Sequence, residues 1–191
     1  MRLGLYGGSF DPIHLGHLFV ARAALEELEL DRLIFVPAFQ SPFKPGQAAL
    51  AASWRVGLVR RALAGCPEYE VSEYEVGRGG VSYSIETVRH FSEQFGEAKL
   101  FYLIGADNVE SLPLWKEARA LAEKVEFAVI PRPGVQPVPP EGFRCVPLEG
   151  VPIGVSSSMI RRRISSGLSV SCYLPAAVDD AIRVNRLYSG D

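Results

Sequence analysis

The sequence predicts a doubly wound α/β fold with a mostly parallel sheet, helices on both faces and a short C-terminal helical portion. Apolar runs of strand length alternate with helical periods along most of the chain, which is typical of repeated strand–helix–strand units. The first unit ends within forty residues, the length of a parallel crossover. A glycine-rich segment follows the first strand, where open parallel sheets bind ligands.

The first predicted strand is the apolar run 3–6. Leu18, Ala21, Leu25 and Leu28 follow at helical spacing and predict a helix. The next apolar run, 33–36, is a second strand, and the proline after it ends that strand because proline cannot donate to a sheet ladder.

The same alternation continues along the chain. A helix near 54–62, a strand at 69–72, a helix near 85–91 and a strand at 100–104 come first, with Trp54 assigned to the core. A helix near 118–122 and a strand at 127–130 follow. Segment 131–140 holds five prolines and a glycine and is therefore a surface loop. Helices near 158–166 and 175–187 close the chain.

Length and composition limit the class of protein. The 191 residues suit one domain, 1–191, in which about 156–191 form the C-terminal helical portion. A hydrophobic content of 48% and a charged content of 22% exclude a disordered chain. Apolar runs are too short for a membrane span or a signal peptide, so we expect a cytoplasmic protein without a membrane partner.

Charge and cysteine content exclude further classes. The formal net charge of −2 argues against a nucleic-acid partner. Three cysteines without CxxC spacing predict neither a disulfide framework nor a zinc site, so the thiols are buried or incidental. The sequence gives no indication of oligomeric state.

The first candidate site is the segment Gly7-Gly8-Ser9-Phe10-Asp11-Pro12-Ile13-His14-Leu15-Gly16-His17. Glycines let a backbone approach a ligand closely, and a helix start offers N–H groups and partial positive charge to phosphate. His14 and His17 lie on one face because they are three residues apart. The alternative is a pair of capping or core histidines, with Phe10 as a core residue and Asp11-Pro12 as a helix-start turn.

This string resembles the (H/T)xGH signature of the nucleotidyltransferase superfamily, and its fuller form GGSFDPIHxGH resembles the bacterial nicotinate-mononucleotide adenylyltransferases. The resemblance implies a Rossmann-like fold and ATP as a substrate, with Mg²⁺ carried by its phosphates and water rather than by protein side chains. It implies that His14 and His17 bind the α- and β-phosphates. ATP-binding residues in this segment would be Gly8, Ser9, Phe10, His14 and His17.

The second candidate site is Ser156-Ser157-Ser158-Met159-Ile160-Arg161, which predicts a serine-capped helix start. Arginines in an early helical turn oppose the helix dipole, and a bound polyphosphate would resolve that conflict. Arg161 is the candidate because it lies closest to the cap, whereas the next two arginines face solvent. A solvated basic turn is the alternative. The segment resembles the second family signature, (I/V)SSTxIR, which implies that the three serines and Arg161 bind ATP.

Three more segments resemble the nicotinate branch. The segment from Gly80 resembles GxSYTxDT, whose backbone N–H groups hold the nicotinate carboxylate; Ile104-Gly105-Ala106-Asp107 resembles (I/L)GAD, and Leu112-Pro113-Leu114-Trp115 resembles LPxW. The resemblance implies that Gly105 and Asp107 serve the ATP site and that Trp115 stacks on the pyridine ring. A helix cap for Asp107 and a core role for Trp115 are the alternatives.

The remaining candidates also belong to the mononucleotide. Lys44 lies in a loop that resembles PPHKP, with Phe43 in place of the family's histidine, and Arg132 matches the family's RPG turn. Lys116, or the backbone near Ser84, is our candidate partner for the nicotinate carboxylate. The resemblance therefore implies Lys44, Tyr83, Ser84, Trp115 and Arg132 as mononucleotide-binding residues. Lys116 is added to them as our own hypothesis, because the family often has tyrosine at that position.

The reaction implied is adenylyl transfer from ATP to nicotinate mononucleotide, giving deamido-NAD and pyrophosphate, with His14, His17 and Arg161 as catalytic residues. The segment at Ser156 is also similar to the phosphopantetheine adenylyltransferases, which remain an alternative. A non-catalytic nucleotide sensor is a second alternative. A tRNA-linked protein is a third, disfavoured by the low net charge.

Overall fold

The computed structural model describes residues 1–42, 50–150 and 154–189. Within these ranges the strands form one six-stranded sheet of order β3-β2-β1-β4-β5-β6, and every strand pair in it is parallel. The strands are β1 (Arg2–Gly8), β2 (Arg32–Pro37), β3 (Tyr69–Val71), β4 (Lys99–Gly105), β5 (Val125–Ile130) and β6 (Cys145–Pro147). The order reverses between β1 and β4, which makes their carboxyl ends the expected ligand site of a Rossmann-like fold.

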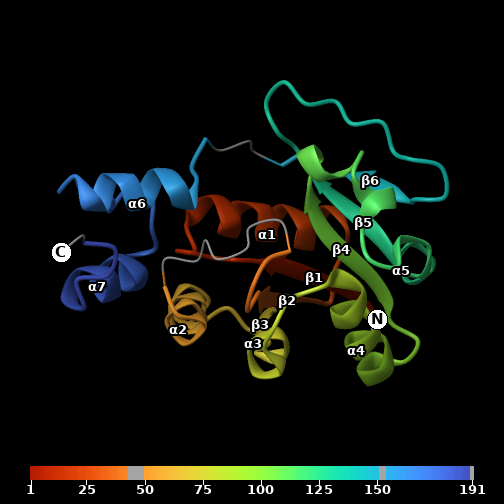
Figure 1. Cartoon of the computed structure of the whole chain (residues 1–191), viewed down its shortest axis with the longest axis horizontal. Helices are drawn as coiled ribbons and strands as arrows, with labels where there is room; N and C mark the ends of the chain where they lie inside the picture. The colour runs from red at the N-terminus through yellow and green to blue at the C-terminus, as the bar shows by residue number, and fades with distance from the viewer. Residues whose placement is uncertain (43–49, 151–153, 190–191) are drawn as a thin grey trace.

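Helices join the strands and extend the chain beyond the sheet. They are α1 (Leu15–Glu27), α2 (Ala52–Ala62), α3 (Tyr74–Arg78), α4 (Ser84–Phe95), α5 (Ala118–Lys124), α6 (Ser157–Ser165) and α7 (Ala176–Val184). Figure 1 shows α6 and α7 together at one end of the molecule and α4 and α5 toward the other. The predicted C-terminal helices and the loop over 131–140, which projects from the sheet, are both present.

Both faces of the sheet are buried, as parallel sheets require. Alternate residues of each strand enter different cores because successive side chains point to opposite faces. Leu33 and Phe35 pack with residues of α1, α2, α6 and α7, whereas Ile34 and Val36 pack with α4 and α5. The doubly wound architecture is thus confirmed.

Several local predictions were wrong or incomplete. The sequence pattern did not predict α3 or β6, since one spans five residues and the other only three. Trp54 is not a core residue, because 38% of its surface is exposed and Arg55 takes the inward position beside it. The cysteines match the incidental alternative of their prediction, because Cys172 is exposed and Cys66 and Cys145 are half-buried, all as free thiols.

Among the described residues, none of the helices combines the length and the apolar character that crossing a membrane would need.

Candidate active site

A cleft of about 550 Å³ lies at the carboxyl end of the central strands. Its walls come from both ends of the chain: the loop after β1, the first turn of α1, the segment after β5 and the start of α6. The structure therefore brings the two segments singled out in the sequence to one cavity.

His14 and His17 form a stacked pair at the start of α1. Their ring centroids are 3.7 Å apart, with 29° between the ring planes. His14 is the N-cap residue, and its backbone N–H donates to Nδ1 of His17 over 3.1 Å. A neutral His17 ring that accepts at Nδ1 carries its proton on Nε2, so the ring is fixed as a donor there.

Both rings are neutral at pH 7. Burial, and then the positive charge of Arg132, lowers the pKa of His14 to about 4. Burial also lowers the pKa of His17 well below its ordinary value, with added repulsion from His14 and Arg132. The Nδ1 atom of His14 is buried and has no hydrogen-bond partner within the described ranges. The pair thus offers neutral N–H donors to an anion at little cost in charge repulsion.

These pKa values predict an acid-sensitive fold. An unfolded histidine binds a proton near its ordinary pKa of about 6.5, whereas folded His14 does so only at about 4. The contribution of neutral His14 to folding stability is therefore fully present at a pH above that ordinary pKa. It is lost progressively as the pH drops toward 4. The loss from His14 alone approaches about 3 kcal/mol. Urea unfolding of the wild type and His14→Asn at several pH values should show a flatter pH dependence for the variant. His90→Gln serves as the control, and equal slopes in all three proteins would contradict the prediction.

The residue before His17 must be glycine for the two histidine rings to stack. A Cβ on Gly16 would lie 3.0 Å from two atoms of the His14 ring. A side chain at this position would displace the ring, so Gly16 permits the stacked arrangement.

In the preceding loop, Phe10 takes a φ of 46° and is buried to 2% exposure, with its ring against the backbone of Gly8.

A buried arginine is hydrogen-bonded to the loop after β1. Arg55 of α2 is 1% exposed and donates to the carbonyl oxygens of Ser9, Phe39 and Leu50 over 2.7, 3.2 and 3.2 Å. It thereby fixes the loop after β1 to the loop after β2, and both loops line the cleft. The sequence interpretation missed Arg55, although its spacing from Leu58 and Ala62 places it on the apolar stripe of α2.

The start of α6 closes the opposite wall. Ser156 is the N-cap, and its Oγ accepts from the backbone N–H of Met159 over 3.2 Å. Ser157 Oγ donates to the carbonyl of Pro12 over 2.9 Å, which ties the two candidate segments together. Arg161 lines the cleft and donates from Nη1 to the carbonyl of Asp11 over 2.7 Å.

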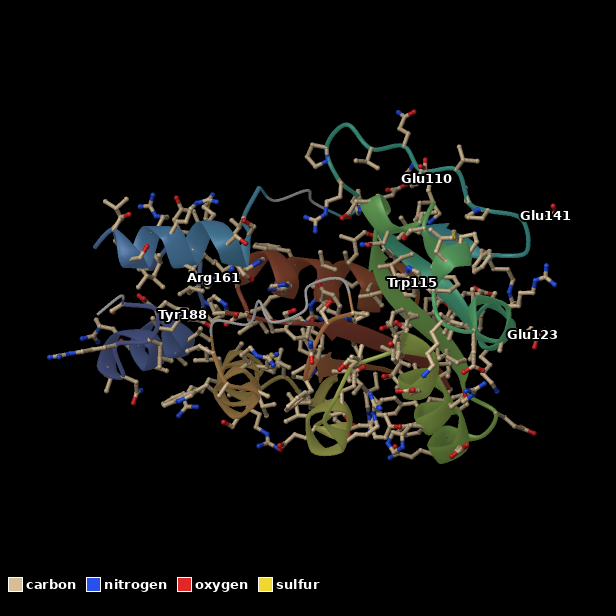
Figure 2. All side chains as sticks on the ribbon, viewed as in Figure 1. Glu110, Trp115, Glu123, Glu141, Arg161 and Tyr188 are labelled. Atoms are coloured by element: carbon tan, nitrogen blue, oxygen red, sulfur yellow. The ribbon has the colours of Figure 1, made fainter. Side chains whose placement is uncertain are left out.

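A second pocket of about 260 Å³ adjoins the cleft. Ser84, Gly105 and Trp115 line it, and the Trp115 ring stands edge-on to Tyr102, with centroids 6.4 Å apart. Ser84 lies at the first position of α4 and donates to the Tyr102 hydroxyl over 2.9 Å. Figure 2 shows Trp115 and Arg161 well apart, as expected for two different ends of a long substrate site.

The sequence-predicted residues divide between these spaces. Those that line the cleft are Ser9, Phe10, His14, His17, Arg132, Ser156, Ser157, Ser158 and Arg161. Those that line the second pocket are Gly8, Ser84, Gly105 and Trp115, together with Ser9, Phe10, His17 and Arg132, which border both. Gly105 therefore faces the second pocket, although the sequence interpretation assigned it to ATP.

Three described candidates line neither the cleft nor the second pocket: Tyr83, Asp107 and Lys116. Asp107 lies 3.6 Å from Nε of Arg132, in a loose ion pair. Lys116 donates to Glu86 over 2.7 Å, and its ammonium lies 4.2 Å from the centre of the Tyr83 ring. Lys44 and Phe43 fall outside the described residues.

The second pocket also holds an acid that the sequence interpretation missed. Glu75 lines the pocket and is 3% exposed, and it accepts hydrogen bonds from Thr87 and Ser82. Burial raises its pKa, and those two hydrogen bonds oppose the rise. Nothing in the sequence pattern separates Glu75 from the exposed acids around it.

Residues 5–163 match the cytidylyltransferase-like family. A Thermus thermophilus protein named "probable nicotinate-nucleotide adenylyltransferase" is 41% identical over 188 residues, covering 98% of this chain and 100% of that protein. An Opitutus terrae protein of the same name is 38% identical over 191 residues, covering 98% of each. The fold is similar to Plasmodium falciparum nicotinic acid mononucleotide adenylyltransferase complexed with NaAD, with a TM-score of 0.80, 16% identity and coverage of 98% and 97% of the two chains.

Proposed function

The chain belongs to the cytidylyltransferase-like family, and within it to the nicotinate-nucleotide adenylyltransferases, and from this we infer that it transfers the adenylyl group of ATP to nicotinate mononucleotide. The products are deamido-NAD and pyrophosphate, and the reaction is a step of NAD biosynthesis. The convergence of the His14–His17 pair and the α6 start on one cleft, with a second pocket beside it, is the observation that supports this reaction best.

The chemistry is an in-line displacement at phosphorus. A 5′-phosphate oxygen of the mononucleotide forms a bond to the α-phosphorus of ATP, while the bond from that phosphorus to the oxygen bridging to the β-phosphate breaks and pyrophosphate leaves. A phosphate monoester is already an anionic nucleophile, so the protein mainly positions the groups and stabilises charge.

The cleft residues suit the triphosphate. We assign the neutral donors of His14 and His17 to the α- and β-phosphate oxygens, where negative charge grows during transfer. The Ser156–Ser158 helix start and Arg161 would hold the departing pyrophosphate. Gly8, Ser9 and Phe10 give the loop that lies along the nucleotide.

The second pocket suits the mononucleotide. Trp115 supplies a ring for stacking on the pyridine, and the N–H groups at the start of α4, near Tyr83 and Ser84, suit its carboxylate. Arg132 borders both spaces and suits the reacting phosphates. Lys44 is assigned to the mononucleotide phosphate from the sequence alone. Gly105 and Asp107 keep their proposed place in the ATP site, where the Asp107 carboxylate suits ribose hydroxyls.

Magnesium would be carried by the phosphates of ATP. Within the described ranges there is no group of three or more His, Cys, Asp or Glu side chains that could hold a metal ion. Asp11 borders the cleft in the loop after β1, is 2% exposed and accepts from Tyr188. We propose that phosphates and water hold the ion, whose charge would help neutralise the triphosphate. The proposal includes a cytoplasmic location, where ATP is available, and small-molecule partners only.

An assay with each acceptor tests the function. The protein is incubated with ATP, Mg²⁺ and one of three acceptors: nicotinate mononucleotide, nicotinamide mononucleotide or phosphopantetheine. Pyrophosphate release and the dinucleotide product are measured. We expect fastest turnover with nicotinate mononucleotide. Release only with phosphopantetheine, or with none of the three, would contradict the function.

Lys116 is expected to influence the choice between acid and amide. Its ammonium neutralises Glu86, which lies in the first turn of α4, where we place the nicotinate carboxylate. Arg78 also pairs with Glu86, over 2.9 Å. In Lys116→Ala only Arg78 would offset the negative charge of Glu86, which would then repel that carboxylate more strongly, so kcat/KM for nicotinate mononucleotide should fall by roughly fivefold. The value for nicotinamide mononucleotide should stay constant. Lys124→Ala removes an exposed lysine of α5 and is the matched control. An unchanged ratio of the two kcat/KM values in Lys116→Ala would refute the role.

A further inference from the structure

The segment after α7 contacts the wall of the cleft through Tyr188. Tyr188 donates its hydroxyl hydrogen to Oδ1 of Asp11 over 2.8 Å, across 177 residues of sequence. The Asp11 side chain is 3% exposed, so its charge is buried in the wall between α6 and the loop after β1. Burial raises the pKa of Tyr188, and the Asp11 carboxylate raises it further, which keeps the hydroxyl protonated as a donor. Figure 2 shows Tyr188 and Arg161 near one another between α6 and α7.

Asp11 in turn contacts Arg161 twice. The backbone oxygen of Asp11 accepts from Nη1 of Arg161 over 2.7 Å, and the carboxylate oxygen Oδ2 lies 4.0 Å from the same nitrogen. The opposite nitrogen, Nη2, lies 3.5 Å from Ser158 Oγ. One edge of the guanidinium is thereby fixed, and a guanidinium has five N–H donors, so others can reach an anion in the cleft.

We propose that Tyr188 and Asp11 are positioning residues that hold the Arg161 guanidinium toward the leaving pyrophosphate. This proposal rests on the role given to Arg161 under the proposed function. Tyr188 restrains the Asp11 carboxylate, and Asp11 restrains Arg161 through its carbonyl and its charge. The C-terminal segment after α7 is therefore part of the apparatus that binds the polyphosphate.

The arrangement predicts an effect confined to one half of the substrate site. A looser Arg161 would weaken contacts with ATP and pyrophosphate. It would leave the mononucleotide pocket unchanged, since neither Tyr188 nor Arg161 lines that pocket. A residue that merely stabilised the fold would lower the amount of active protein and leave both KM values as they are.

Tyr188→Phe removes only the hydroxyl and keeps the ring, which packs against the core that contains α1 and α7. We expect KM for ATP and Kd for pyrophosphate to rise by about tenfold, with KM for nicotinate mononucleotide unchanged. Tyr173→Phe is the matched control, because Tyr173 packs against the same core and no hydrogen bond of its hydroxyl occurs among the described residues. That control should behave as the wild type.

A double-mutant cycle with Arg161→Ala decides whether Tyr188 acts through Arg161. The effect of Tyr188→Phe should vanish in the Arg161→Ala background, because there is no guanidinium left to position. Equal effects in both backgrounds would overturn the proposal, as would an equal rise in KM for both substrates. If Tyr188→Phe does not fold, Asp11→Asn takes its place in the cycle and should show the same loss of effect. Wild-type protein without adenylyl transfer would instead refute the proposed function itself.

Discussion

His17→Ala is expected to lower kcat for adenylyl transfer by about 10²- to 10³-fold, the usual cost of removing one donor to a developing charge. The hydrogen bond at Nδ1 fixes the proton on Nε2, so the wild-type ring presents one N–H group in a defined place. Alanine removes that donor. Steady-state kinetics with ATP and nicotinate mononucleotide measure the loss.

A second substitution separates the donor from the helix cap. His17 is the third residue of α1, the position from which a glutamine side chain can reach back to the N-cap N–H. His17→Gln should therefore keep the start of α1 ordered while it removes the imidazole. We expect it to lose most of the activity lost by His17→Ala but to unfold closer to the wild type.

The control for both variants is His90→Ala. His90 stacks on Tyr74, with ring centroids 3.9 Å apart, and it lines neither the cleft nor the second pocket. Its removal should leave kcat unchanged. Near wild-type turnover in folded His17→Ala would refute the assigned role of the ring.

The fold and the location of the site were predictable because they depend on local patterns. Short, continuous apolar runs predicted the central strands. Residues 33–36 are buried, as such a run requires in a sheet covered on both faces. Glycine and histidine spacing marked the start of α1, and serines marked the start of α6. The parallel order of the strands then places the start of α1 and the start of α6 at the same edge of the sheet.

The contacts that hold the site in shape were not predictable in this way. Tyr188 and Asp11 meet across 177 residues, and no periodicity connects two single residues at that distance. The position of Lys116 depends on its partner Glu86, thirty residues away. Charge compensation and hydrogen-bond partners are properties of the folded chain, whereas spacing shows only which face of an element a residue occupies.

Arg55→Met is expected to destabilise the fold by about 3–5 kcal/mol, the range for removing one member of a buried charged network. Methionine fills much of the space but donates no hydrogen bonds, so the carbonyls of Ser9, Phe39 and Leu50 would be left buried without this partner. Burial lowers the pKa of Arg55, and the Asp11 carboxylate opposes that shift by favouring the charged form. Its removal would therefore also leave Asp11 with one less compensating charge. Urea unfolding at neutral pH measures the change.

Arg61→Met in the same helix is the matched control. The Arg61 guanidinium is exposed and donates to the carbonyl of Gly57 in its own helix, so its loss should cost well under about 1 kcal/mol. A similar cost for both variants would show that the three loop carbonyls do not depend on Arg55. If the prediction holds, Arg55→Met should also raise KM for both substrates, because the loops after β1 and β2 border both spaces. Effects on the two KM values would then distinguish Arg55, which supports the whole site, from Tyr188, which acts on the ATP side alone.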